Sequence, residues 1–408
     1  MWRSVVGRPS RAWALGLLVA FTAAAVTLSL AAGARHDYVS YLEQWRLTMS
    51  GGDPWDQSLI AQNPGYGPLF NALAPLAAIF SLLPKLIFVA VWVGIAILLP
   101  RLFQADRACS RLAPGVFAYF VLTPYFWIEI AAYGHFDILP AAATLASIHL
   151  TLKHQARLGA GILALGALLK TYPIFAFPFL LRARPGRWKS PVFSLGGTCA
   201  AVFALSYVIW GNSTFTAIFL PAAQKSDLFS IFRFARGRYS PLQLLSENPN
   251  LDAASVPLLV LAGALLVALL ARPGNHVVVG ILVTFISIFA LFKLGHPQFQ
   301  MVVFVVAPYL LLTLPDAVRG DRIILGALGT YLAWFTLLDL LYLVGGGLRE
   351  PPWIILREVL GLPTFVLALT VVVVLLKFRT QPVIAPGGEA GSDPASPRKG
   401  LKPRATVA

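Results

Sequence analysis

The sequence predicts an all-α polytopic membrane protein, folded as a helical bundle with about twelve transmembrane helices. Three observations predict this class. The 408 residues have a mean hydropathy of +0.74, 58% of them are hydrophobic and only 12% are charged, which is too apolar for a soluble domain. Long apolar segments recur between short polar connections. The formal net charge of +15 is concentrated in alternate connections, as in loops that face the cytosol.

The apolar segments define the predicted spans. The first follows several arginines, as in a signal peptide, but it is longer than the apolar part of one and further spans follow, so we expect it to be retained. Residues 69–83 are apolar but short, and counting them as a crossing would place a cluster of arginines outside. We therefore expect interfacial or re-entrant helices there. The predicted spans are residues 12–34, 84–101, 112–132, 138–152, 158–170, 171–182, 190–210, 254–271, 276–292, 299–315, 323–343 and 358–376.

The positive-inside rule then places both termini in the cytosol and residues 35–83 and 211–253 in outer loops. Residues 1–379 form a single transmembrane domain. Residues 380–408 are rich in Pro, Gly, Ser and Lys and are expected to be a disordered cytosolic tail near anionic lipid heads. Because topology accounts for the positive charge, we expect membrane lipids and no nucleic acid among the partners. The expected location is a bacterial plasma membrane, with the site on its outer face.

The first outer loop holds the leading candidate for chemistry. Asp37 follows the first span directly, with Tyr38 and Glu43 beside it in the sequence. A carboxylate partly shielded by aromatic rings could act as a general base on a hydroxyl group. The alternative is interfacial anchoring, since Tyr and Trp mark the headgroup level. We interpret the neighbouring His36 as a polar interface residue.

A second group of ionisable residues lies in the turn between the third and fourth spans. His135 and Asp137 follow Glu129 there, and they could bind sugar hydroxyls or a divalent ion. One His with one or two acids is not specific to any metal, so a divalent ion stays open as a cofactor and none is assigned. The alternative is a solvated turn. Glu129 is expected to face the bundle interior.

Cations are grouped at a few places on the predicted outer side, as a phosphate site would require. Snorkelling explains each cation separately but not their grouping. Asp339 and Glu358, near the ends of the last two spans, are expected to be satisfied polar groups of the bundle. The grouped cations are Lys170, the three arginines Arg233, Arg236 and Arg238, and Lys293. The polar residues His296 and Gln298 follow Lys293 closely in the sequence.

Short motifs across residues 35–310 then resemble those of the GT-C superfamily of polyprenyl-phosphate-sugar-dependent glycosyltransferases. Within it the chain looks most like the catalytic subunit of GPI mannosyltransferase I and its prokaryotic relatives. Each motif is short, but all occur in the family's order. They are the acid-Tyr pair at 37–38, GGDPWD at 51–56, YGPL at 66–69, GHFD at 134–137, LKTYP at 169–173, RFARGRYSP at 233–241 and PQFQ at 297–300. Two positions depart: the first loop has a single acid where the family has two, and Tyr239 replaces an Asn.

The resemblance implies a function and roles. A sugar, expected to be mannose, would pass from a polyprenyl-phosphate donor to a lipid- or glycan-linked hydroxyl acceptor on the outer face, with inversion. Asp37 would be the catalytic base and Asp137 its partner from the second loop. Arg233, Arg236 and Arg238 would meet the donor phosphate, together with Lys170 or Lys293. The other substrate-binding residues would be Tyr38, Glu43, Tyr66, His135, His296 and Gln298.

Three alternatives remain open at this level. A lipid or sugar transporter or flippase could also use twelve spans, although its ionisable groups would be expected near the bilayer midplane. A glycan polymerase or ligase would use a larger, lipid-linked oligosaccharide donor. A scaffold subunit would tolerate replacement of Asp37.

Overall fold

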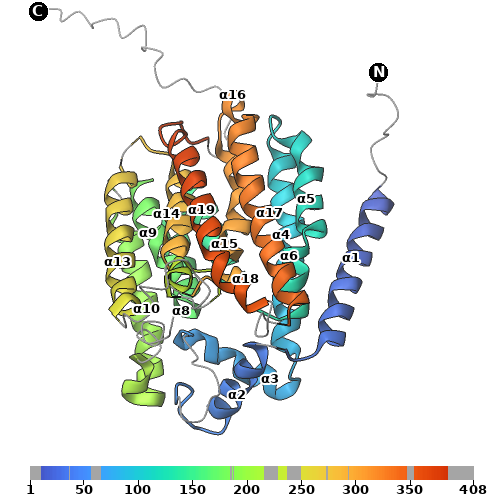
Figure 1. Ribbon diagram of the computed structural model, residues 1–408, viewed down its shortest axis with the longest axis vertical. Helices are drawn as coiled ribbons and strands as arrows, with labels where there is room; N and C mark the ends of the chain where they lie inside the picture. The colour runs from blue at the N-terminus through green and yellow to red at the C-terminus, as the bar shows by residue number, and fades with distance from the viewer. Residues whose placement is uncertain are drawn as a thin grey trace, which may run out of the picture.

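The computed structural model describes residues 11–35, 37–56, 66–183, 186, 188–215, 228–236, 250–272, 274–292, 294–346 and 353–384. Within these ranges the chain forms helices and turns and no β-strand, which confirms the predicted all-α class. Most helices run roughly parallel in one bundle, and the short helices α2 (Asp37–Met49) and α3 (Ala74–Ile79) lie across one end of it (Figure 1). We call this the α2 end and the opposite one the far end.

Five described helices are long and apolar enough to cross a membrane, so the chain is a multi-pass integral membrane protein. Proline often sits in the first turn of a helix, as Pro84 does in α4, because the amide that it lacks has no partner there. The long helices are α1 (Arg11–Ala32), α4 (Leu83–Ala105), α10 (Lys189–Trp210), α17 (Arg322–Val344), and α19 (Gly361–Leu376), which continues the short α18 (Trp353–Val359).

The third predicted span is a broken helix and brings the number to six if it counts as one crossing. The first half is α5 (Ala113–Leu122), and the axis then bends by 44°. Pro124 explains the break, because it has no amide hydrogen to continue the ladder of α5. After α6 (Pro124–Phe126) the chain continues as a π-helical turn, Trp127–Ala132. Such turns are rare and are frequent at functional sites.

Apart from α13 (Asn250–Leu270), of which Leu258–Leu270 is described as an apolar helix, the remaining apolar helices are shorter than a span, so the structure does not establish the predicted count of about twelve. Hydropathy cannot separate a short buried helix from a crossing, since both are uniformly apolar. Two of these helices form the bundle core, with nearly every side chain buried: α14 (Val277–Leu291) and α15 (Met301–Thr313). The others are α7 (Ile138–Leu152), α8 (Ala156–Leu169), η4 with α9 (Tyr172–Ala176 and Phe177–Arg182) and α13 (Asn250–Leu270). Short helices at connections are η2 (Ser110–Leu112), η5 (Gly211–Phe215), α12 (Ile231–Arg236), η7 (Pro297–Gln300) and α16 (Asp316–Arg319).

The segment predicted as the first outer loop packs through its aromatic rings. The ring of Tyr41 lies 5.1 Å from that of Phe70 and 5.6 Å from that of Phe136, joining α2 to η1 (Pro68–Leu73) and to the turn before α7. The Trp45 indole donates a hydrogen bond to the Phe70 carbonyl at 3.1 Å. The interfacial stretch expected at residues 69–83 is therefore a pair of short helices at the α2 end (Figure 1).

Candidate active site

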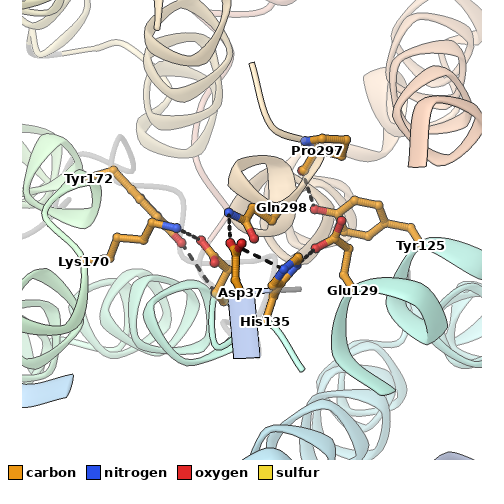
Figure 2. Close-up of polar contacts among 9 residues, drawn as sticks. Asp37, Tyr125, Glu129, His135, Lys170, Tyr172, Pro297 and Gln298 are labelled. Carbon is orange, nitrogen blue, oxygen red and sulfur yellow. Dashed lines mark hydrogen bonds and ion pairs between the residues drawn. The ribbon is translucent and has the colours of Figure 1, made fainter. Parts of the chain in front are cut away.

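Asp37 is the first residue of α2, where the positive end of the helix dipole favours a carboxylate. Its side chain is 25% exposed, so one face of it is open to solvent. Oδ2 accepts a hydrogen bond of 3.2 Å from the Gln298 amide and lies 3.7 Å from Nε2 of His135. Figure 2 shows these groups converging from α2, η7 and the turn before α7.

The imidazole of His135 bridges two carboxylates. Its Nε2 faces Asp37, and its Nδ1 is paired with the buried carboxylate of Glu129, which the π-helical turn presents to it (Figure 2). The turn needs glycine at position 134, where φ is +77° and a Cβ atom would lie 2.8 Å from the Tyr38 ring. The His135 amide donates to the Glu129 carbonyl at 2.8 Å, which fixes the turn on the π-helix.

Asp137 and Lys170 form a second ion pair beside the first. Nζ of Lys170 lies 2.7 Å from Oδ1 of the fully buried Asp137 and 4.3 Å from the centre of the Phe299 ring. Asp137 precedes α7, and Lys170 ends α8 in an extended conformation. Oδ2 of Asp137 is buried and has no hydrogen-bond partner among the described residues. The ion pair neutralises Lys170, which was predicted from the sequence to bind the donor phosphate.

Neighbouring charges set the protonation of the cluster. Burial by itself raises the pKa of Asp37, but His135, His296, the Gln298 amide and Lys170 together hold it below its ordinary value. Burial lowers the pKa of His135, and the opposing carboxylates of Glu129 and Asp37 raise it above its ordinary value. We therefore describe the centre as an ionised Asp37 held beside an imidazolium.

Burial also acts on the pKa values of His296 and Asp137. Burial lowers the pKa of His296 to about 4, against the attraction of Asp37. Burial also raises the pKa of Asp137, although Lys170 opposes this shift. His296 precedes η7 and packs its ring 5.7 Å from that of Phe299. A neutral imidazole can both donate and accept a hydrogen bond, which suits the recognition of a hydroxyl group.

Three residues of the first loop were predicted to bind substrate, and their side chains have different surroundings. Tyr66 packs its ring 5.0 Å from Tyr41 and is influenced electrostatically by Asp37, so it lines the cluster. Tyr38 is fully buried, and its hydroxyl donates to the Ser81 carbonyl at 2.7 Å, which gives it a packing role. Glu43 is half-buried, with Oε2 lacking a hydrogen-bond partner among the described residues.

The described segment 228–236 of the predicted second outer loop contacts the site through its backbone. At Gly295, where φ is +25°, a Cβ atom would lie 2.3 Å from the Ser230 amide nitrogen, so only glycine allows this approach. Ser230 in turn accepts a hydrogen bond from the Arg233 amide at 3.0 Å. Because Gly295 precedes His296 and η7, the segment 228–236 lies beside the residues that contact Asp37.

The predicted arginine cluster is only partly described. Arg233 forms an ion pair of 2.6 Å with Glu358, and its side chain stays 27% exposed. Its Nε is buried and lacks a hydrogen-bond partner among the described residues. Arg236 ends α12, and nothing is described of its side chain. His36, Arg238 and Lys293 lie outside the described residues.

The structure adds two residues to those that the sequence singled out. Glu129 was expected to face the bundle interior, and its burial agrees, but it also contacts His135 in the cluster. Asp339 was expected to be a satisfied group of the bundle, and its buried carboxylate lies against the carboxyl group of Glu129. It interacts electrostatically with Glu129. The available signal was an acid within an apolar span, which marks function more often than packing. Glu358 is satisfied, by Arg233.

No group of three or more His, Cys, Asp or Glu side chains within the described ranges could hold a metal ion. His135 lies close enough to pair with both Asp37 and Glu129, and each of its two ring nitrogens faces one of these carboxylates. The cluster can hold a fixed anion at its edge and offer amide and imidazole groups beside it.

Comparison with known protein families gives one match. The sequence profile described as glycosyltransferase family 87 matches residues 64–292, which is more than half of the chain. The matched region includes Glu129, His135, Asp137, Lys170 and Arg233, whereas Asp37 precedes it and Gln298 follows it. No curated protein matches the chain.

Proposed function

The chain belongs to glycosyltransferase family 87, and from this premise we propose that it moves mannose from a polyprenyl-phosphate donor to a lipid- or glycan-linked hydroxyl acceptor. Family membership makes the protein a membrane glycosyltransferase with a sugar donor and an acceptor, and so speaks against a transporter or a scaffold. The donor, the sugar, the acceptor and the stereochemistry are the proposal.

The observation that carries the proposal is the setting of Asp37. Its carboxylate is ionised, partly open to solvent and held from two sides by Gln298 and His135. A general base must be ionised and must reach the proton that it removes, and an exposed oxygen at the end of a bundle meets both conditions. No other carboxylate of the described cluster combines this exposure with a charged form.

In the proposed reaction Asp37 takes the proton of the acceptor hydroxyl while that oxygen attacks the anomeric carbon. The bond between this carbon and the phosphate oxygen breaks, and polyprenyl phosphate leaves with the electron pair. One displacement inverts the anomeric configuration. Gln298 orients the carboxylate of Asp37, and His296, Tyr66 and Asp137 are placed to bind hydroxyl groups of the sugar or the acceptor.

Glu129 acts on Asp37 through His135 in this proposal. The carboxylate of Glu129 helps to raise the pKa of His135, and a charged His135 in turn lowers the pKa of Asp37. Asp339, on α17, lies next to Glu129 and supports this arrangement. Both are positioning residues.

The leaving phosphate needs cations, and the start of the second outer loop is the proposed place for them. Arg233 keeps an exposed face and a free Nε donor despite its pairing with Glu358. Arg236, Arg238 and Lys293 would join it when the donor binds. Lys170, paired with Asp137, would balance charge at the sugar end.

We further propose the predicted topology of about twelve crossings, with the α2 end outside. Support comes from the polarity of the bundle, since α4, α7 and the segment formed by η4 and α9 all run from the α2 end toward the far end. Acids described near the far end are few, namely Asp106, Asp316 and Asp321. The basic residues there are Arg101, Arg107, Arg111, Lys153, Arg157, Arg182, Lys189, Arg272, Arg319, Arg322, Lys377 and Arg379.

The test supplies purified protein or membranes with radiolabelled polyprenyl-phosphate mannose, with the glucose and arabinofuranose donors in parallel and native lipid extract as acceptor. Transfer from the mannose donor alone supports the proposal, and a chelator arm shows whether a divalent ion is needed. Transfer from another sugar would correct the sugar. Transfer only from a lipid-linked oligosaccharide would replace the donor class and identify a polymerase or ligase.

A further inference from the structure

A cavity of about 240 Å³ lies at the far end of the bundle, away from the Asp37 cluster. It is formed where α7, α9 and α13 end, where α14 begins, and by the chain that follows α19. Two helices connect the cavity to the site. One is α7, which runs from Asp137 in the site to Leu152 in the cavity wall, and the other is α14, which runs from Val277 in the cavity wall toward His296.

The polar side of the cavity is cationic. Arg182 and Arg272 both line it and both are exposed, and neither forms an ion pair with a described residue. Nε of Arg272 donates to the Ala268 carbonyl at 3.2 Å, which anchors the side chain and leaves its terminal nitrogens available. Asn275 and Gln381 add amide groups, and none of the residues that line the cavity is acidic. Two guanidinium groups without a carboxylate suit a phosphate.

The other side of the cavity is apolar. Leu152, Phe179, Leu270, Val277 and Val383 form this wall. Outside it, the C-terminal half of α13 presents Leu265 and Leu269, each 54% exposed, toward the surroundings of the bundle. A free inorganic anion would gain nothing from such a wall, whereas a phosphate attached to a hydrocarbon tail would bury its tail there.

The sequence beside the cavity is typical of a membrane surface. Residues 182–189 read RARPGRWK, a stretch between α9 and α10 with four basic residues and no acid. Trp188 in this stretch is 54% exposed, as expected for an indole at the level of lipid headgroups. The cavity therefore opens where anionic headgroups are found.

We propose that this cavity binds the headgroup of an anionic phospholipid, with its phosphate between Arg182 and Arg272 and an acyl chain along α13. The bound lipid ties together the far ends of α7, α9 and α14. Asp137 precedes α7 and His296 follows α14 at the opposite end of the bundle, so occupancy stabilises helices that position the site. The proposal is independent of which sugar or acceptor the enzyme uses.

The experiment uses the full-length protein in a neutral detergent, with native mass spectrometry for lipid binding and tryptophan fluorescence for thermal unfolding. Probes are dioleoyl phosphatidylglycerol, dioleoyl phosphatidylcholine and millimolar sodium phosphate. We expect phosphatidylglycerol to bind and to raise the unfolding temperature, with weak effects from the other two. The variant Arg182→Gln/Arg272→Gln should bind phosphatidylglycerol about tenfold more weakly or worse, since two charge-assisted contacts are removed.

The matched control is Arg101→Gln/Arg322→Gln, which removes the same charge from exposed far-end positions outside the cavity. It should keep the affinity of the unmodified protein. Equal losses in both double variants would mean general surface attraction and would overturn the site. Equal binding of phosphatidylcholine would also overturn it, and equal stabilisation by inorganic phosphate would assign the cavity to a free anion. The exposed arginines can be replaced without opening the core, and unchanged unfolding temperatures without lipid would verify this.

Discussion

At the α2 end, Lys170 is buried 2.7 Å from Asp137, whereas at the far end Arg182 and Arg272 are exposed with no described carboxylate beside them. The same residue types therefore serve different purposes in one bundle. At the α2 end, cations pair with carboxylates, and these pairs hold the acids in a fixed geometry. At the far end, cations remain available to an anion from outside. Net charge alone would hide this contrast.

The largest expected effect is at the α2 end. Asp37→Asn keeps the shape of the side chain but removes the base, so the transfer rate should fall by about 10³-fold, within the range for general base catalysis. Radiolabelled sugar transfer at equal protein level measures it. Asp53→Asn is the control, being the same change in the same loop, where the side chain accepts a hydrogen bond from the Trp55 amide that Asn can also accept. Full activity of Asp37→Asn would remove Asp37 from the mechanism.

The next effect concerns the buried ion pair. Lys170→Met leaves Asp137 buried without its cation, which should reduce the free energy of unfolding by about 3 kcal/mol. Lys153→Met, at an exposed far-end lysine, should change it by less than about 0.5 kcal/mol. Thermal or denaturant unfolding compares the two. Similar losses in both would mean that the pair does not differ from a surface charge.

A third effect separates positioning from packing at the α2 end. Glu129→Gln removes the anion that raises the pKa of His135, so His135 becomes neutral at a lower pH. Asp37 then loses the cation that lowers its pKa, and its pKa rises. The acid limb of the pH profile of kcat/KM should therefore move to higher pH. A lower rate with an unmoved limb would leave Glu129 with a packing role only.

The smallest effect is expected at the far end. Arg182→Gln in lipid-free detergent should change the free energy of unfolding by less than about 0.5 kcal/mol, because an exposed cation without a partner contributes little. Unfolding curves with and without phosphatidylglycerol test the contrast directly. A large loss without lipid would mean that Arg182 is held by the protein as firmly as Lys170.

The sequence predicted the fold class and most helix positions, because apolar periodicity and length are local properties. Residues 138–152, for example, were predicted as a helix and form α7 with the same bounds. The number of crossings stays a prediction, since α14 and α15 are as apolar as a span but shorter than one and almost wholly buried. Only the assembled bundle distinguishes a helix that touches lipid from one that touches other helices.

Several residues of the candidate site could be singled out from the sequence, but the contacts between them could not. Asp37, His135 and Gln298 were each singled out, but the hydrogen bond that joins residues 37 and 298 depends on the whole bundle. Gln298 was predicted to bind a substrate, and the structure shows it on Asp37. The pairing of Arg233 with Glu358 likewise joins residues that no local pattern relates.

The short helices also determine how deep the reaction takes place. At 1.5 Å per residue, α7 and α8 are about 22 and 21 Å long, whereas α4 is about 35 Å long and the hydrocarbon layer is about 30 Å thick. Counted from the far end, the helices that carry Asp137 and Lys170 therefore stop short of the full thickness of the hydrocarbon layer. In the proposed reaction, this depth would let a lipid-borne sugar reach the carboxylates while its isoprenoid stays in the bilayer.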